Sequence, residues 1–162
     1  TWPDFTRIPN HLYPSVRFQE IEVELPFTIN DLPGGPLEVI AVEVNHIVPT
    51  TGLLLRQGSS SIIFTSDTGP TSRIWEVANA TEDLAAIITE VSYPKRMQDV
   101  ADVSLHLTPK SLSAALEKIE QEVPVYLYHF KPPYIDELRE ELAAAKLPVP
   151  VEELVQDRLY RF

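Results

Sequence analysis

The chain has 162 residues, a length that buries one hydrophobic core, so we expect a single domain over residues 1–162 or a large part of one. With 13 basic against 24 acidic residues the net charge is −11, which repels polyanions and argues against a nucleic-acid partner. The absence of cysteine excludes disulfides and cysteine-ligated zinc and fits a cytoplasmic protein. No apolar run approaches the ~20 residues of a membrane span, so no membrane partner is expected.

The first 65 residues predict extended structure. Residues 1–15 are rich in proline and aromatic side chains and have neither a helical nor a strand period, which predicts an irregular segment. Alternating apolar positions predict a half-buried strand over residues 16–25 and a second strand over residues 37–44. Apolar runs on either side of Gly58 predict a hairpin over residues 53–64.

The rest of the chain alternates helices with strands. Thr108 followed by Pro109 is a helix-start signal, an N-cap and a first-turn proline. The patterns predict helices over residues 70–80, 97–101, 109–120 and 134–146, and strands over residues 84–88, 123–128 and 155–162. This order predicts an α+β fold, with a mixed, mostly antiparallel sheet covered by helices on one face.

Ionisable residues stand directly after the predicted strands. Asp67, Glu90 and His129 each follow an apolar strand, and His46 follows the strand over residues 37–44. His106 lies just before a predicted helix. In sheets whose strands alternate with helices, ligand sites lie just beyond the carboxyl ends of the strands. We therefore expect these side chains to lie close together. Imidazoles and carboxylates at one edge suit metal binding and proton transfer.

Each of these residues also has a structural alternative. Asp67 is compatible with an ordinary turn, and Glu90 with a solvated strand end. His46 could cap its strand by hydrogen bonding, His106 could be a helix-capping partner, and His129 could be a hydrogen-bonded core histidine. The recurrence of an ionisable residue at three consecutive strand ends favours the functional interpretation.

Four motifs carry a family resemblance. They read SDTGP from Ser66, E-x-S-Y from Glu90, S-x-H-x-T-P from Ser104 and H-x-K-P from His129. Their order and spacing resemble the C-terminal half of the metallo-β-lactamase superfamily, and most closely its class II 3′,5′-cyclic-nucleotide phosphodiesterases. The match covers roughly residues 40–146. It implies an αββα fold, of which this chain would be the C-terminal half.

The resemblance also implies roles for individual residues. The activity would be hydrolysis of a cyclic nucleotide of the cAMP or cGMP class with two divalent metal ions, zinc favoured and magnesium or manganese as alternatives. Asp67 would bridge the two metals, and His129 would be a terminal ligand of one. Glu90 and His106 would be the catalytic, proton-donating pair beside the leaving oxygen. The residues expected to contact substrate are His46, Thr50, Thr51 and Lys131.

The chain lacks one defining motif of the family. The family's His-x-His-x-Asp-His motif is absent, so most of the metal ligands are missing, and we expect this chain alone to be inactive and to bind no metal at the family's two-metal site. Residue 1 is Thr and the only methionine is Met97, so we expect a fragment or a processed product. Its exposed sheet face would pack on the missing N-terminal half or on a second copy.

Two other functions are compatible with the sequence. One is a transfer-RNA 3′-processing endonuclease of the same superfamily, which the net charge of −11 disfavours. The other is a non-catalytic scaffold or partner-binding domain with this fold, which the missing histidine motif supports.

Overall fold

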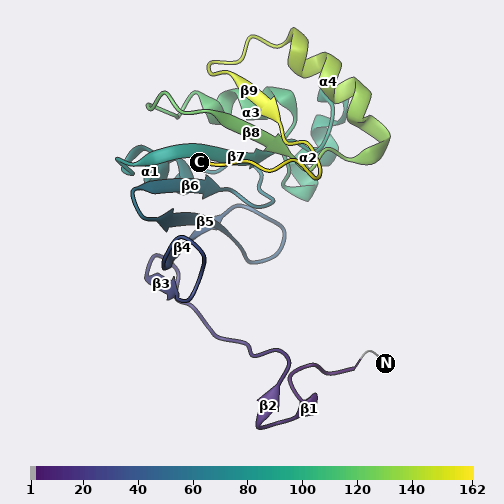
Figure 1. Cartoon of the computed structure of the whole chain (residues 1–162). Helices are drawn as coiled ribbons and strands as arrows, with labels where there is room; N and C mark the ends of the chain where they lie inside the picture. The colour runs from purple at the N-terminus through teal and green to yellow at the C-terminus, as the bar shows by residue number, and fades with distance from the viewer. Residues whose placement is uncertain (1–2) are drawn as a thin grey trace.

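A seven-stranded sheet forms the body of the molecule (Figure 1). The computed structural model describes residues 3–162. In spatial order the strands are β3 (Pro26–Ile29), β4 (Leu37–Val44), β5 (Thr50–Gln57), β6 (Ser60–Phe64), β7 (Leu84–Glu90), β8 (Val125–Tyr128) and β9 (Val151–Glu153). Strands β3 to β6 pair antiparallel, and strands β6 to β9 pair parallel. The predicted mixed sheet is therefore confirmed, but its strand pairs are divided equally between antiparallel and parallel instead of being mostly antiparallel.

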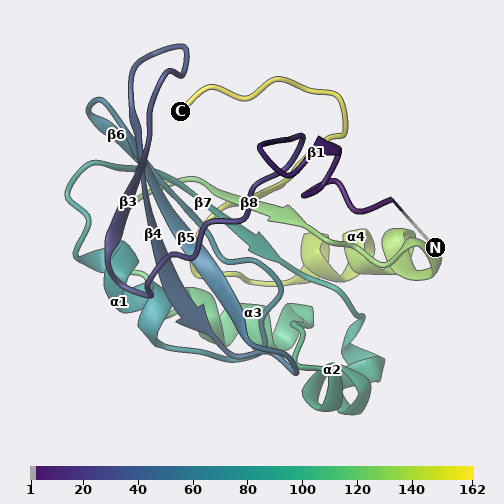
Figure 2. The ribbon, with the colours of Figure 1, turned by 90° about the horizontal axis from the view of Figure 1, so that it is seen from below.

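Four helices connect the strands of the parallel half or follow them. They are α1 (Arg73–Asn79), α2 (Gln98–Ser104), α3 (Pro109–Leu116) and α4 (Ile135–Ala144), with 3₁₀ turns η1 (Lys95–Met97) and η2 (Pro132–Tyr134). Figure 2 shows the helices gathered along one face of the sheet. Helix α3 begins where the sequence predicts, because Thr108 and Ser111 cap each other: each hydroxyl accepts the other's backbone N–H, at 3.3 and 2.9 Å.

The core lies between this face and the helices. Leu54, Ile63, Ile87 and Val125 are aligned neighbours on four consecutive strands, and each is at least 96% buried. They belong to one cluster with Trp75 and other apolar residues of the helices. Each such side chain contributes about 1.5–3 kcal/mol through burial, so this row fixes which face of every strand the helices cover.

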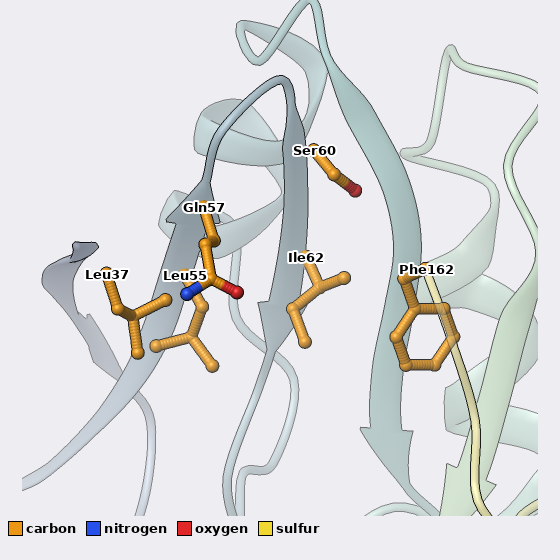
Figure 3. A pocket seen from close by; sticks show the side chains of 6 residues that line it. All are labelled: Leu37, Leu55, Gln57, Ser60, Ile62 and Phe162. Atoms are coloured by element: carbon orange, nitrogen blue, oxygen red, sulfur yellow. The ribbon is translucent and has the colours of Figure 1, made fainter. Parts of the chain in front are cut away.

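The opposite face is only half covered, and we call it the open face. Its residues alternate with those of the core row, and the half-buried apolar ones are Leu37, Leu53, Leu55, Ile62, Phe64 and Ile88. The last residue, Phe162, reaches this face and contacts the ring of Tyr126, with 5.4 Å between ring centroids. Phe162, Leu55 and Ile62 line a pocket of about 260 Å³, in which Ile62 lies between the other two (Figure 3).

Two predicted strands are wrong. Residues 16–25 do not pair with any strand: Phe18 is 87% exposed, and Glu24 has a left-handed backbone with φ of 63°. The apolar positions alternate there, but every residue of the segment remains exposed. Residues 155–162 are also irregular, because the tail folds back so that the Val155 N–H donates to the Tyr160 hydroxyl at 2.9 Å.

Smaller differences concern the ends of elements. Helix α1 begins at Arg73 rather than at residue 70, and α3 and α4 end at Leu116 and Ala144 rather than at residues 120 and 146. The N-terminal segment projects away from the sheet (Figure 1) and contains one small hairpin, β1 (Pro9–Asn10) with β2 (Tyr13–Pro14). Within residues 3–162, every helix is too short or too polar to cross a membrane.

Candidate functional site

The sheet topology brings the predicted site residues to one edge. Strands β4 and β6 are both antiparallel to β5, so they run in the same direction, and β7 and β8 run parallel to β6. The carboxyl ends of β4, β6, β7 and β8 therefore meet at the same edge. His46, Asp67, Glu90 and His129 lie at or just beyond these four ends.

Glu90 is the buried centre of the site. Its carboxylate has no solvent exposure and is surrounded by four hydrogen-bond partners. Oε1 accepts from the Thr68 N–H at 2.9 Å and from His106 Nδ1 at 2.6 Å. Oε2 accepts from the Ser92 hydroxyl at 2.6 Å and from the Leu107 N–H at 3.3 Å. A buried carboxylate is tolerated when donors of this kind replace water.

His106 is held in one tautomer by this carboxylate. The side chain is 9% exposed, and its Nδ1–H donates to Glu90. Nε2 forms no hydrogen bond with any residue in the range 3–162, so its lone pair is available. A carboxylate behind an imidazole orients the ring and raises the basicity of its far nitrogen.

His46 lies against His106. Its Nδ1 donates to the Leu105 carbonyl at 3.0 Å, and the two imidazole rings meet edge to face with 5.0 Å between centroids. Gly69 packs closely here: a Cβ at this position would lie 3.1 Å from the Leu105 Cα. One ligand atom from each of His46, Asp67 and His106 lies within 4.8 Å of the other two.

Asp67 and His129 form a second pair beside the first. His129 Nδ1 lies 3.0 Å from Asp67 Oδ1, and Lys131 Nζ donates to His129 Nε2 at 3.1 Å. Burial lowers the pKa of the His129 imidazole; Asp67 opposes this shift and Lys131 adds to it. Burial raises the pKa of the Tyr128 phenol well above its usual range, with Asp67 contributing, so this hydroxyl stays protonated and donates to Asp67 Oδ1 at 3.5 Å.

Ser92 connects the two pairs. While its hydroxyl donates to Glu90, the same oxygen lies 3.4 Å from His106 Nδ1 and 3.3 Å from His129 Nδ1. Sequence reasoning did not assign a role to Ser92 or to Tyr128. The position of Ser92 in the E-x-S motif was a usable signal, whereas the hydroxyl of Tyr128 is placed by the fold alone.

Three residues at the site have a left-handed backbone although none is glycine. Their φ angles are 56° at Ser66, 52° at Leu105 and 68° at His129. Such a conformation costs roughly 1–2 kcal/mol at a non-glycine residue. Ser66 precedes Asp67 and Leu105 precedes His106, so these turns set where the site side chains emerge.

The predicted substrate residues are only partly brought to the cluster. Lys131 reaches His129, as described above, and His46 lies against His106. Thr50 and Thr51 begin β5 instead of lying in a loop. The Thr50 hydroxyl donates to the Val48 carbonyl, and within residues 3–162 no hydrogen bond links either threonine to the cluster.

Comparison with known proteins finds likeness in structure alone. No protein-family model and no curated protein sequence matches the chain. The metallo-β-lactamase fold protein YhfI from Bacillus subtilis is similar, with a TM-score of 0.61 at 16% identity over 83% of this chain and 51% of YhfI. Igni18, a metallo hydrolase from Ignicoccus hospitalis, has a TM-score of 0.57 at 14% identity over 83% of this chain and 56% of that protein.

A third similar structure is the short form of human tRNase Z, with a TM-score of 0.53 at 14% identity over 81% of this chain and 44% of the nuclease. The chain thus spans about half the length of the solved structures it matches. At this identity the likeness concerns the fold. The order of strands and helices and these similarities together show that the chain has the α+β fold of the metallo-β-lactamase type.

Proposed function

We propose that this chain is the proton-donating half of a metal-dependent hydrolase that cleaves a phosphodiester, with 3′,5′-cyclic nucleotides as the favoured substrate class. The observation that carries the proposal is the buried Glu90–His106 pair, whose 2.6 Å hydrogen bond leaves one imidazole nitrogen available at the edge of the sheet. The pair lies where ligands bind in folds of alternating strands and helices.

The pair suits a general acid. Glu90 accepts the Nδ1 proton of His106, so the proton delivered to a leaving oxygen would come from Nε2. The carboxylate stabilises the imidazolium before transfer and keeps the ring from rotating. The backbone N–H groups of Thr68 and Leu107 hold the carboxylate in place from behind. General acid catalysis of this kind contributes about 10²–10⁴-fold in rate.

Divalent metal ions would supply the remaining chemistry, polarising the phosphoryl group and generating the nucleophile. Asp67 and His129 would be the ligands from this chain, as the resemblance implies. The chain has only four histidines, and no two of them stand in a His-x-His spacing, so the other ligands must come from outside these 162 residues. Both nitrogens of His129 have partners at present, so binding there requires the ring to be released by Lys131 or Asp67.

The second candidate is a nuclease that processes the 3′ end of transfer RNA. The similarity to human tRNase Z favours it. The net charge of −11 favours a small substrate instead, because binding of a long polyanion depends on a basic surface. A non-catalytic domain of the same fold would not need a buried, fully hydrogen-bonded carboxylate behind a histidine.

The test is an activity assay on a protein that contains this chain together with the completing half of the fold, loaded with Zn²⁺ or Mn²⁺. His106→Ala should slow hydrolysis of cAMP by roughly 10²–10⁴-fold without releasing the metal held by Asp67 and His129, whereas Asp67→Ala should release that metal. His11→Ala, at an exposed site outside the sheet, is the control. Hydrolysis of cAMP by His106→Ala at the parent rate would refute the assignment, and cleavage of precursor transfer RNA alone would favour the nuclease.

A further inference from the structure

We propose that His46, Asp67 and His106 form a binding site for one transition-metal ion, Zn²⁺ by its donor set, on this chain without any other half. This inference goes beyond the proposed function, in which Asp67 and His129 are the ligands. It starts from a distance: one ligand atom from each of the three side chains lies within 4.8 Å of the other two. An ion between them would draw these atoms closer together, because zinc bonds to nitrogen and oxygen are about 2.0–2.2 Å long.

Both imidazoles are already arranged as metal ligands. Nδ1 of His46 donates to a backbone carbonyl at 3.0 Å, and Nδ1 of His106 donates to the Glu90 carboxylate at 2.6 Å. In each ring the proton is therefore on Nδ1, and Nε2 presents a lone pair. Histidines that bind metals almost always donate their other ring N–H to a carbonyl or a carboxylate in this way.

The third donor and the surroundings select the type of ion. Asp67 has a side chain that is 37% exposed, so its carboxylate can be reached from solvent. Two imidazole nitrogens and one carboxylate oxygen match a zinc site that keeps its fourth position for water. Calcium and magnesium prefer a shell of oxygens alone, so this donor set disfavours them.

A different triad in the same cluster is closed to an ion. Ligand atoms of Glu90, His106 and His129 also lie within 4.8 Å of one another. Glu90 is wholly buried, however, and its two oxygens already accept four hydrogen bonds. His129 Nε2 faces the ammonium group of Lys131 at 3.1 Å, which repels a second cation. The side of the cluster with His46 is therefore the one that accepts an ion.

The site has a consequence that does rest on the proposed function. An ion on Nε2 of His106 occupies the nitrogen that would donate the proton to the leaving oxygen. The two uses of His106 exclude each other, so Zn²⁺ bound at this triad would inhibit the hydrolase rather than activate it.

Titration of the metal-free chain with Zn²⁺ by calorimetry tests the site directly. We expect one ion per chain. His46→Ala and Asp67→Asn should each weaken binding by more than the 10–100-fold typical for loss of an outer hydrogen-bond partner. His129→Gln removes an outer hydrogen-bond partner of Asp67, so it should weaken binding by at most about that 10–100-fold. The control His11→Gln should leave binding unchanged. Circular dichroism confirms that each variant is folded, and His46 is the safest position because its ring is half-exposed.

Three results would overturn the inference. One is the absence of binding by the folded parent chain. Another is loss of binding in His129→Gln with full binding in His46→Ala, which would place the ion at the pair used in the proposed function. The third is several ions per chain with no effect of any variant, which would indicate adventitious binding to the acidic surface. None of these depends on enzymatic activity, so the inference can fail while the proposed function stands.

Discussion

Removal of the Ser92 hydroxyl should destabilise the fold measurably. Ser92 and Glu90 are both fully buried, and the hydroxyl donates to the carboxylate at 2.6 Å. A hydrogen bond to a charged group is worth about 1.5–3 kcal/mol net, and water cannot replace it at this depth. Ser92→Ala should therefore lower the free energy of unfolding by about 1.5–3 kcal/mol. For a chain of this size, each kcal/mol lowers the melting temperature by about 2–4 °C, so we expect a fall of about 3–12 °C.

Urea unfolding followed by circular dichroism measures this loss. Ser113→Ala is a matched control, because Ser113 lies half-exposed on α3 and its hydroxyl forms no hydrogen bond with any residue from 3 to 162. The control should remain within about 0.5 kcal/mol of the parent. If Ser92→Ala unfolds at the same urea concentration as this control, the hydroxyl does not hold the Glu90 carboxylate, and the geometry described for the buried centre is wrong.

Three further outcomes are expected. Gly52→Ala should cost about 1–3 kcal/mol in urea unfolding, because the new Cβ would lie 3.0 Å from the Phe64 carbonyl, and an unchanged midpoint would contradict this packing. The folded state lowers the pKa of His129, so below about pH 6.5 the unfolded chain takes up the proton first. In EDTA the melting temperature should therefore fall as the pH drops below this value. His129→Gln should weaken that dependence, and identical pH curves for parent and variant would exclude a contribution from His129. We also propose that the isolated chain dimerises through the open face, so sedimentation should give a dimer that Leu55→Glu converts to a monomer, and a well-folded parent monomer would refute this.

The fold was predictable where local signals agreed with the final packing. The apolar run over residues 84–88 predicted β7 correctly, and the Thr108–Pro109 pair marked the start of α3. The errors came from elements that depend on distant partners. Residues 16–25 alternate correctly but form no strand, although the Glu24 N–H donates to the Ala41 carbonyl of β4 at 2.8 Å. The three residues of β9 form a strand because β8 lies beside them.

The functional site was likewise predictable only where local sequence signals were sufficient. Strand ends were sufficient to identify His46, Asp67, Glu90 and His129 as residues that meet at one edge, whereas His106 lies between α2 and α3 and was found from its motif. Neither signal could indicate that His46 and His106 share an edge-to-face contact, or that Ser92 lies between two imidazoles. Thr50 and Thr51 were expected near substrate because the family resemblance implied it. The pairing of Val44 with Thr50 extends β5 and gives these residues a structural position instead.

The residues with a left-handed backbone at the site limit how far this protein can be stabilised without loss of function. Glycine at position 66 or 105 would relieve the backbone and, from that contribution alone, stabilise the chain by up to roughly 1–2 kcal/mol per site. The same exchange would loosen the turns that aim Asp67 and His106. Selection for heat resistance would therefore favour changes that selection for function opposes, a trade-off between stability and activity confined to a few backbone positions. Thermostable variants should accordingly arise in the helices and on the open face before they arise at this edge of the sheet.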